Sequence, residues 1–347
     1  MKMDTRKQQV LLAIITDFIS TAEPVGSRTI ARKFDLGVSP ATIRNEMSDL
    51  EEMGYIEQPH TSAGRIPSQM GYRYYVDFLM KKKNLTSQEE EKIRRGYEKK
   101  VREIGQVISR TGVLLSQMTK FAAVIVTPKI DTSSFKRIQL LLMNPGQAMA
   151  IVVMNTGALQ SSIFDVPEGV GQVDLDTISE VLNAKLSGLT MDKIKMTLIR
   201  EIYFELSRHK NILDLAVHLI ENSLTADRED KVYLGGILNV LNQPEFHNIE
   251  KVKTLLSLLE QEDLLRSLMG GSDPGEGVAV RIGGEMRKEE VKDCSMVVAN
   301  YHLDGRAVGS IGVLGPTRMD YAWVVSVVEF MTRNLSETME KMIKGWR

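Results

Sequence analysis

Residues 39–67 read SPATIRNEMSDLEEMGYIEQPHTSAGRIP, and this stretch decides the fold. Ser39 is a good helix cap, and Pro40 suits the first helical position because an N–H would have no intrahelical partner there. Gly54 is the residue type that ends such a helix. The apolar residues between them recur at helical spacing and predict one buried face: Ile43, Met47, Leu50 and Met53.

A hairpin is predicted directly after this helix. Residues 55–58 form a short strand, 59–64 a loop, and 65–67 an edge strand, in which proline is tolerated. Two helices are predicted upstream: an amphipathic one ended by the sequence EPVG at 23–26, and a short one capped by Ser27. Three helices followed by a hairpin make a winged helix-turn-helix, whose third helix enters the DNA major groove.

The face of the third helix opposite the buried stripe supplies candidate DNA contacts. Arg44 can fork to a guanine edge, and Asn45 can pair with adenine. Side chains at the helix N-terminus suit a phosphate, second-helix arginines suit the DNA backbone, and Gly64 would let the wing tip approach that backbone closely. The complete set is Arg28, Arg32, Ser39, Ala41, Thr42, Arg44, Asn45, Ser48, His60, Thr61, Ser62, Gly64 and Arg65.

Charge alone does not point to nucleic acid. The formal net charge is −1, and six basic and six acidic residues balance between positions 24 and 73. Three of the acids, Asp49, Glu51 and Glu52, lie in the C-terminal half of the third helix, which we expect to be held away from phosphate. Non-specific affinity for DNA should therefore be modest. A winged helix used only for protein contacts is the alternative.

These residues resemble the HrcA family of heat-inducible transcription repressors. One departure is Ser68-Gln69, where the family pattern has Thr followed by an acidic residue; it lies beside the wing, and we expect it to matter little. The resemblance covers nearly the whole chain because its motifs lie at both ends: PVGS at 24–27, SPATIRNEM at 39–47, GYI at 54–56, PHTSAGRIP at 59–67, GYRYYVD at 71–77 and GSIGVLGPTRMDY at 309–321.

The resemblance implies a homodimer that represses chaperone operons by binding an inverted-repeat operator called CIRCE. It further implies that the chaperonin GroEL keeps the repressor active, until misfolded clients occupy the chaperonin during heat stress. It also implies an α+β fold of three parts. These are a winged helix (residues 1–80, then a connecting helix at 81–119), a GAF-like domain (120–170 plus 276–347) and an inserted, mainly helical dimerisation domain (171–275).

The remaining sequence is consistent with a split domain. A long helix is predicted over about 85–118, opened by a capping box at Ser87–Glu90. Ten basic and five acidic residues between 81 and 110 favour a solvated helix face over a DNA-binding flank. Six predicted strands and a C-terminal helix over 323–343 indicate one α+β domain: 121–126, 137–143, 148–154, 278–282, 295–301 and 307–313. Between them lie two apolar rows that could pack a core or a dimer: Ile212, Leu215, Ala216, Leu219 and Ile220, then Leu255, Leu256, Leu258 and Leu259.

Nothing in the sequence indicates an enzyme. The five histidines lack metal-ligand spacing, no Walker-type loop is present, and no cofactor or metal is predicted. The lone Cys294 favours a buried, inert thiol over a redox sensor and is typical of a cytoplasmic protein. No signal peptide or membrane span is expected. A regulator whose GAF-like pocket binds a metabolite stays open as an alternative.

Overall fold

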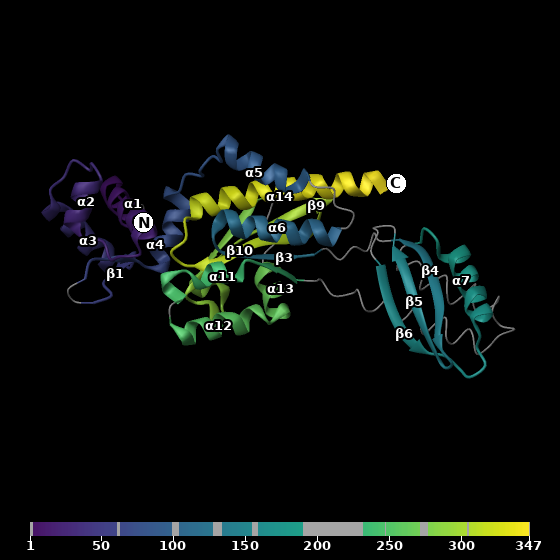
Figure 1. Cartoon of the computed structure of the whole chain (residues 1–347). Coiled ribbons are helices and arrows are strands. Elements are labelled where there is room, and N and C mark those ends of the chain that lie inside the picture. The colour runs from purple at the N-terminus through teal and green to yellow at the C-terminus, as the bar shows by residue number, and fades with distance from the viewer. Residues whose placement is uncertain are drawn as a thin grey trace.

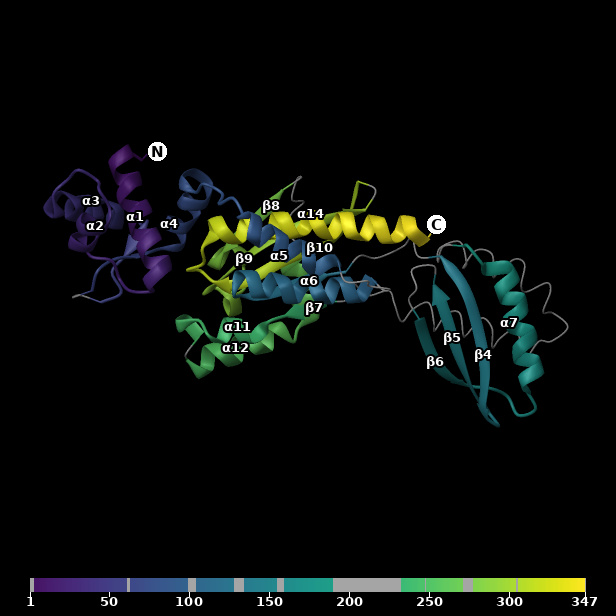
Figure 2. The same ribbon diagram turned by 45° about the horizontal axis from the view of Figure 1, so that its top comes forward.

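The computed structural model shows an elongated α+β protein in which three parts lie in a row in space (Figure 1). The winged helix and a small three-stranded sheet lie at opposite ends, and a larger sheet domain lies between them (Figures 1 and 2). The structure describes residues 3–60, 63–98, 104–127, 134–154, 159–189, 232–246, 248–270, 277–303 and 305–346.

The predicted winged helix is present. Its elements are α1 (Thr5–Thr21), α2 (Ser27–Lys33), α3 (Pro40–Glu52), β1 (Ile56–Glu57) and β2 (Ile66–Pro67). The strands β1 and β2 pair antiparallel, as the hairpin prediction requires. The sides of α1 and α3 that the spacing assigned to the core are mostly buried: Val10, Leu11, Ile14 and Ile15 in α1, and Ile43, Met47 and Leu50 in α3. Met53, also predicted for this face, is half-buried and lies just after the last residue of α3.

The connecting segment differs from the prediction of one long helix. After α4 (Gln69–Tyr74) and a π-helical turn (Tyr75–Leu79), the chain forms α5 (Ser87–Glu98) and α6 (Ile104–Thr119). The Thr111 hydroxyl donates to Tyr97 Oη at 2.9 Å, although 14 residues would span about 21 Å along a straight helix. The two helices therefore pack side by side. The capping box also begins one residue earlier than predicted, since Thr86 exchanges hydrogen bonds with Glu89.

The central domain is built on a five-stranded antiparallel sheet in the order β7-β3-β10-β9-β8. Its α14 helix (Tyr321–Trp346) and α6 cover one face, while α11 (Ile237–Leu241), α12 (Ile249–Leu259) and α13 (Glu262–Gly270) cover the other (Figure 2). The strands are β3 (Ala122–Val126), β7 (Val232–Gly235), β8 (Val278–Ile282), β9 (Cys294–Leu303) and β10 (Arg306–Pro316). Alternate residues of β3 enter the two cores, as a doubly covered strand requires. Short 3₁₀ turns complete this domain: Pro244–Phe246, Gly283–Met286 and Glu289–Val291.

The prediction that six strands share one domain is wrong for two of them. The second and third predicted strands, now β4 (Phe135–Asn144) and β5 (Gln147–Met154), pair with β6 (Leu159–Asp165) in a separate sheet. Helix α7 (Gln172–Leu186) covers that sheet and completes its own apolar core. The central sheet contains β7 as its fifth strand, although β7 lies in the range that the sequence analysis assigned to the inserted domain. Apolar residues define which faces of a strand are buried but not the strand with which it pairs, so six apolar runs were not enough to separate the two sheets.

The two apolar rows considered for a dimer surface have different outcomes. The first row, at 212–220, lies outside the described residues. In the second row, Leu255, Leu258 and Leu259 are buried in the core between α12 and the central sheet, and Leu256 is partly exposed. That row therefore packs a core. Among the helices of the described ranges, none is long and apolar enough to cross a membrane.

Candidate nucleic-acid interface

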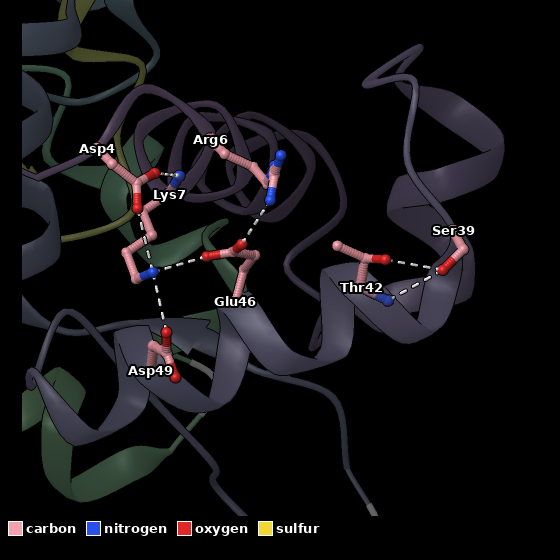
Figure 3. A network of polar contacts seen from close by, with 7 residues as sticks. All are labelled: Asp4, Arg6, Lys7, Ser39, Thr42, Glu46 and Asp49. Atoms are coloured by element: carbon pink, nitrogen blue, oxygen red, sulfur yellow. Dashed lines mark hydrogen bonds and ion pairs between the residues drawn. The ribbon is translucent and has the colours of Figure 1, made fainter.

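The N-terminus of α3 is capped as its sequence predicts. The Ser39 hydroxyl accepts a hydrogen bond from the Thr42 N–H at 3.1 Å and lies 2.9 Å from the Thr42 hydroxyl (Figure 3). Pro40 occupies the first helical position. The cap therefore fixes where α3 begins, and with it the rotational phase of every residue along the helix.

That phase exposes the residues proposed to contact DNA. Ala41, Arg44, Asn45 and Ser48 are exposed and Thr42 is half-buried, while the core stripe lies on the opposite side. Arg28 and Arg32 of α2 are exposed as well. Within the described residues, Arg28, Arg32 and Arg44 form no ion pair with an acidic side chain. Three guanidinium groups are thus available to an external anion.

Two acidic residues of α3, Glu46 and Asp49, are neutralised from α1 (Figure 3). Lys7 Nζ lies 2.9 Å from both Glu46 and Asp49 and 3.2 Å from Asp4. Arg6 lies 3.5 Å from Glu46, which is 9% exposed. Hydrogen bonds, first to Glu46 and then to Asp49, raise the pKa of Lys7, so it stays charged. The charge count missed this network because half of it comes from a helix outside the counted range.

The wing is held by an ion pair that the sequence did not suggest. Arg65 Nε and Nη2 lie 2.8 and 2.6 Å from Glu51 Oε2 on α3. The Arg65 predicted to contact DNA is therefore engaged inside the protein and joins the wing to the helix. Of the other wing residues predicted to contact DNA, His60 is exposed, whereas Thr61 and Ser62 lie outside the described residues.

Gly64 has a packing role inside the protein that the sequence did not predict, and its predicted approach to DNA stays a prediction. A Cβ at this position would lie 2.5 Å from the carbonyl oxygen of Val25 and 2.8 Å from the carbonyl carbon of Pro24. The neighbouring Arg65 exchanges two backbone hydrogen bonds with Val25, each of 2.9 Å. The absent side chain thus permits close packing of the wing against the chain's own backbone.

Gln69 makes contacts between domains that the sequence did not predict. Its amide donates to the Lys292 carbonyl at 3.0 Å and accepts from the Gly284 N–H at 2.9 Å, joining α4 to the central domain. An acidic residue here could only accept hydrogen bonds. The departure from the family pattern at Gln69 therefore belongs to a domain contact that sequence reasoning missed, together with those of Arg73 and Arg318 described below.

The central domain offers no redox or metal chemistry among the described residues. Cys294 is 2% exposed, and burial raises the pKa of its thiol to about 12, which agrees with the prediction of an inert cysteine. No group of three or more His, Cys, Asp or Glu side chains within the described ranges is arranged to hold a metal ion.

Comparison with known proteins assigns these features to a family. Residues 105–325 match the family model described as HrcA protein C terminal domain. The chain is 64% identical over 345 residues to the heat-inducible transcription repressor HrcA of Pelotomaculum thermopropionicum, covering 99% of each chain. It is 60% identical to the corresponding repressor of Desulforamulus reducens, again over 99% of each. A crystal structure of a protein described only as hypothetical has the same fold, with a TM-score of 0.65, 24% identity and 98% of both chains covered.

Proposed function

The chain belongs to the HrcA family of heat-inducible transcription repressors, and from this premise we propose that it represses genes by binding a CIRCE-type inverted repeat as a homodimer. It is accordingly a regulator and not an enzyme. Each protomer presents α3 to the major groove of one half-site, so that two-fold protein symmetry matches operator symmetry. The protein acts in the cytoplasm, where the chromosome lies.

One observation carries the proposal: Arg28, Arg32 and Arg44 face outward and form no ion pair among the described residues, while Glu46, Asp49 and Glu51 of α3 have partners inside the winged helix. Arg44 and Asn45 have the chemistry to recognise guanine and adenine edges. Ser39 and Thr42, at the positive end of α3, suit a phosphate. Arg28, Arg32, Ala41 and Ser48 extend this surface, with the wing segment around His60, Thr61 and Ser62 beside it.

A fluorescence-anisotropy titration at fixed moderate salt tests operator binding. The intact inverted repeat is compared with a duplex in which one half-site is scrambled. Tight binding to the first duplex and much weaker binding to the second would support a symmetric, operator-binding dimer. Equal, weak binding to both, with or without chaperonin, would contradict the proposal and favour a winged helix that contacts only protein.

We further propose that heat and chaperonin availability control this activity, as the family resemblance implies. A folded domain is stabilised by only about 5–15 kcal/mol, and a dimer loses stability on dilution. Heating should therefore lower the fraction of DNA-competent dimer, and chaperonin should restore it. Circular dichroism melts and operator binding, each measured with and without GroEL, test this control. A dimer that stays folded and DNA-competent well above growth temperature, and is indifferent to GroEL, would exclude it.

A further inference from the structure

Two arginines cross the boundary between the winged helix and the central domain. Arg318, in the loop between β10 and α14, donates from Nη1 to the Ile19 carbonyl at 2.6 Å. Ile19 lies in the last turn of α1, where carbonyl groups lack intrahelical partners and favour a cation. The same guanidinium contacts the Glu245 carboxylate through Nε at 2.5 Å and Nη2 at 3.3 Å. Arg318 thus caps a helix of one domain while it is anchored in the other.

Arg73 makes the reciprocal contact. It extends from α4 of the winged-helix side, and its Nε and Nη2 lie 2.7 and 2.5 Å from the two carboxylate oxygens of Glu285. Nη2 also donates to the Val280 carbonyl of β8 at 2.7 Å. Glu285 is itself oriented, because it accepts from the Ile282 N–H at 2.8 Å. This planar, two-point geometry fixes direction as well as distance.

The surface between the two arginines is packed. The rings of Tyr72 and Tyr321 lie 5.8 Å apart at 57°, and both side chains are almost fully buried. Their apolar neighbours belong to one cluster that runs from the core of the winged helix into the core beneath α14. The winged helix is therefore seated on the central domain by apolar contact, and the arginines determine its orientation.

The side chain of Arg318 is only 11% exposed and that of Glu245 is 23% exposed. A pair buried to this extent adds little net stability, because desolvation offsets most of the attraction between the charges. What such a pair supplies is a defined geometry, since breaking it leaves a buried charge without a partner. Such an arrangement is suited to holding a DNA-binding domain at one angle.

We propose that Arg318 and Arg73 are positioning residues that set the direction of each winged helix and thereby the half-site spacing that the repressor accepts. The inference rests on the proposed function. Once one half-site of an inverted repeat is bound, binding of the second is intramolecular, and its strength depends on whether the geometry allows both contacts together. A rigidly seated winged helix accepts one spacing, whereas a loosened one accepts several, each with lower affinity.

The test compares three duplexes: the inverted repeat, the same repeat with its spacer lengthened by about half a turn (~5 base pairs), and a single half-site. The variants are Arg318→Ala, Arg318→Lys and Arg73→Ala. Lysine keeps the charge but cannot form the fork, which protects the experiment against simple unfolding. The matched control is Arg333→Ala, which removes an exposed arginine of α14 whose ion pair among the described residues lies within its own helix.

We expect the wild-type protein and the control to prefer the native spacing by about 100-fold or more, the range of avidity gains from linked sites. In the variants this preference should fall at least about tenfold, while affinity for the single half-site stays within about twofold. An unchanged preference in a folded Arg318→Lys or Arg73→Ala protein overturns the proposal. An equal loss on all three duplexes also overturns it, because the arginines would then support only the fold.

A second readout does not depend on DNA. Spin labels on Asp35→Cys and Glu260→Cys, both at exposed positions, report the distance between the winged helix and the central domain, which changes with the orientation of one relative to the other. The native Cys294 is buried and does not compete for the label. Labelled protomers are diluted with unlabelled protein so that distances within one chain dominate. A distance distribution that broadens in Arg318→Ala supports the positioning role even if operator binding fails, and an unchanged distribution refutes it.

Discussion

Replacing Gly64 with alanine tests whether this glycine serves the protein's own packing or its contact with DNA. The added Cβ would lie 2.5 and 2.6 Å from the carbonyl oxygen and carbon of Val25 and 2.8 Å from the carbonyl carbon of Pro24. All three are backbone atoms, so no flexible side chain can move aside. The wing must instead shift and weaken the two 2.9 Å hydrogen bonds between Val25 and Arg65.

The expected magnitude follows from these two losses. Forcing an extra carbon into packed structure costs about 1–3 kcal/mol, and each lost hydrogen bond costs about 0.5–1.5 kcal/mol. Together they lower the stability of the winged helix by about 2–6 kcal/mol. Since about 1.4 kcal/mol corresponds to a factor of ten, hydrogen exchange of peptides containing Val25 and Arg65 should accelerate at least about 30-fold.

Gly270→Ala is the matched control. Gly270 is the last residue of α13, and among the described atoms none lies within 4 Å of a Cβ added there. Its exchange rates and melting temperature should stay at wild-type values. If Gly64→Ala also keeps wild-type exchange and melting but loses operator affinity, the packing argument is refuted, and Gly64 serves the approach to DNA instead.

Three further predictions concern single side chains. Arg44→Ala should weaken specific operator binding about tenfold to 100-fold (~1–3 kcal/mol) while Arg333→Ala leaves it unchanged; equal anisotropy titrations for the two would remove Arg44 from the site. Gln69→Glu should lower the melting temperature below that of the wild type near neutral pH, because the carboxylate cannot donate to the Lys292 carbonyl. This difference should shrink at acidic pH, when the carboxyl is protonated; a difference from the wild type that stays the same at every pH would contradict the prediction. Cys294 should react with a thiol reagent at pH 8 only after denaturation, and rapid labelling of the native protein would show that the thiol is accessible. Because the pKa of the folded thiol is raised to about 12, its contribution to stability should be complete below the pKa of the unfolded thiol and should decline as the pH rises toward 12.

The features that the sequence predicted correctly depend on residues that lie close together in the chain. The cap at Ser39 and the spacing of Ile43, Met47 and Leu50 fix the start and phase of α3, and therefore its exposed face. Both signals act within a few turns of one helix. The hairpin of β1 and β2 and the limits of β8 follow from equally short-range rules.

What the sequence could not predict depends on partners far away in the chain. β3 pairs with β10 and β7, neither of which is near it in sequence, whereas β4 and β5 pair through the short turn between them. Every residue of β3 is buried, whereas buried and more exposed residues alternate along β5, but neither pattern identifies the strand with which it pairs. The domain contacts of Gln69, Arg73 and Arg318 were missed for the same reason. Arg318 does lie within a motif that carried the family resemblance, but the motif gave no role to it.

The charges of the winged helix resolve an apparent contradiction in the sequence. A segment with balanced charge and four acids on its third helix is a poor binding partner for a polyanion if all charges count equally. They do not, because Lys7 holds Glu46 and Asp49 while Arg65 holds Glu51. The guanidinium groups of Arg28, Arg32 and Arg44, which form no ion pair among the described residues, then contribute three accessible positive charges to the exposed face, although the domain as a whole stays near neutral. In the proposed dimer, few phosphate contacts would mean weak non-specific binding and a shallow salt dependence, so specificity would come from base edges and from the spacing of the two winged helices.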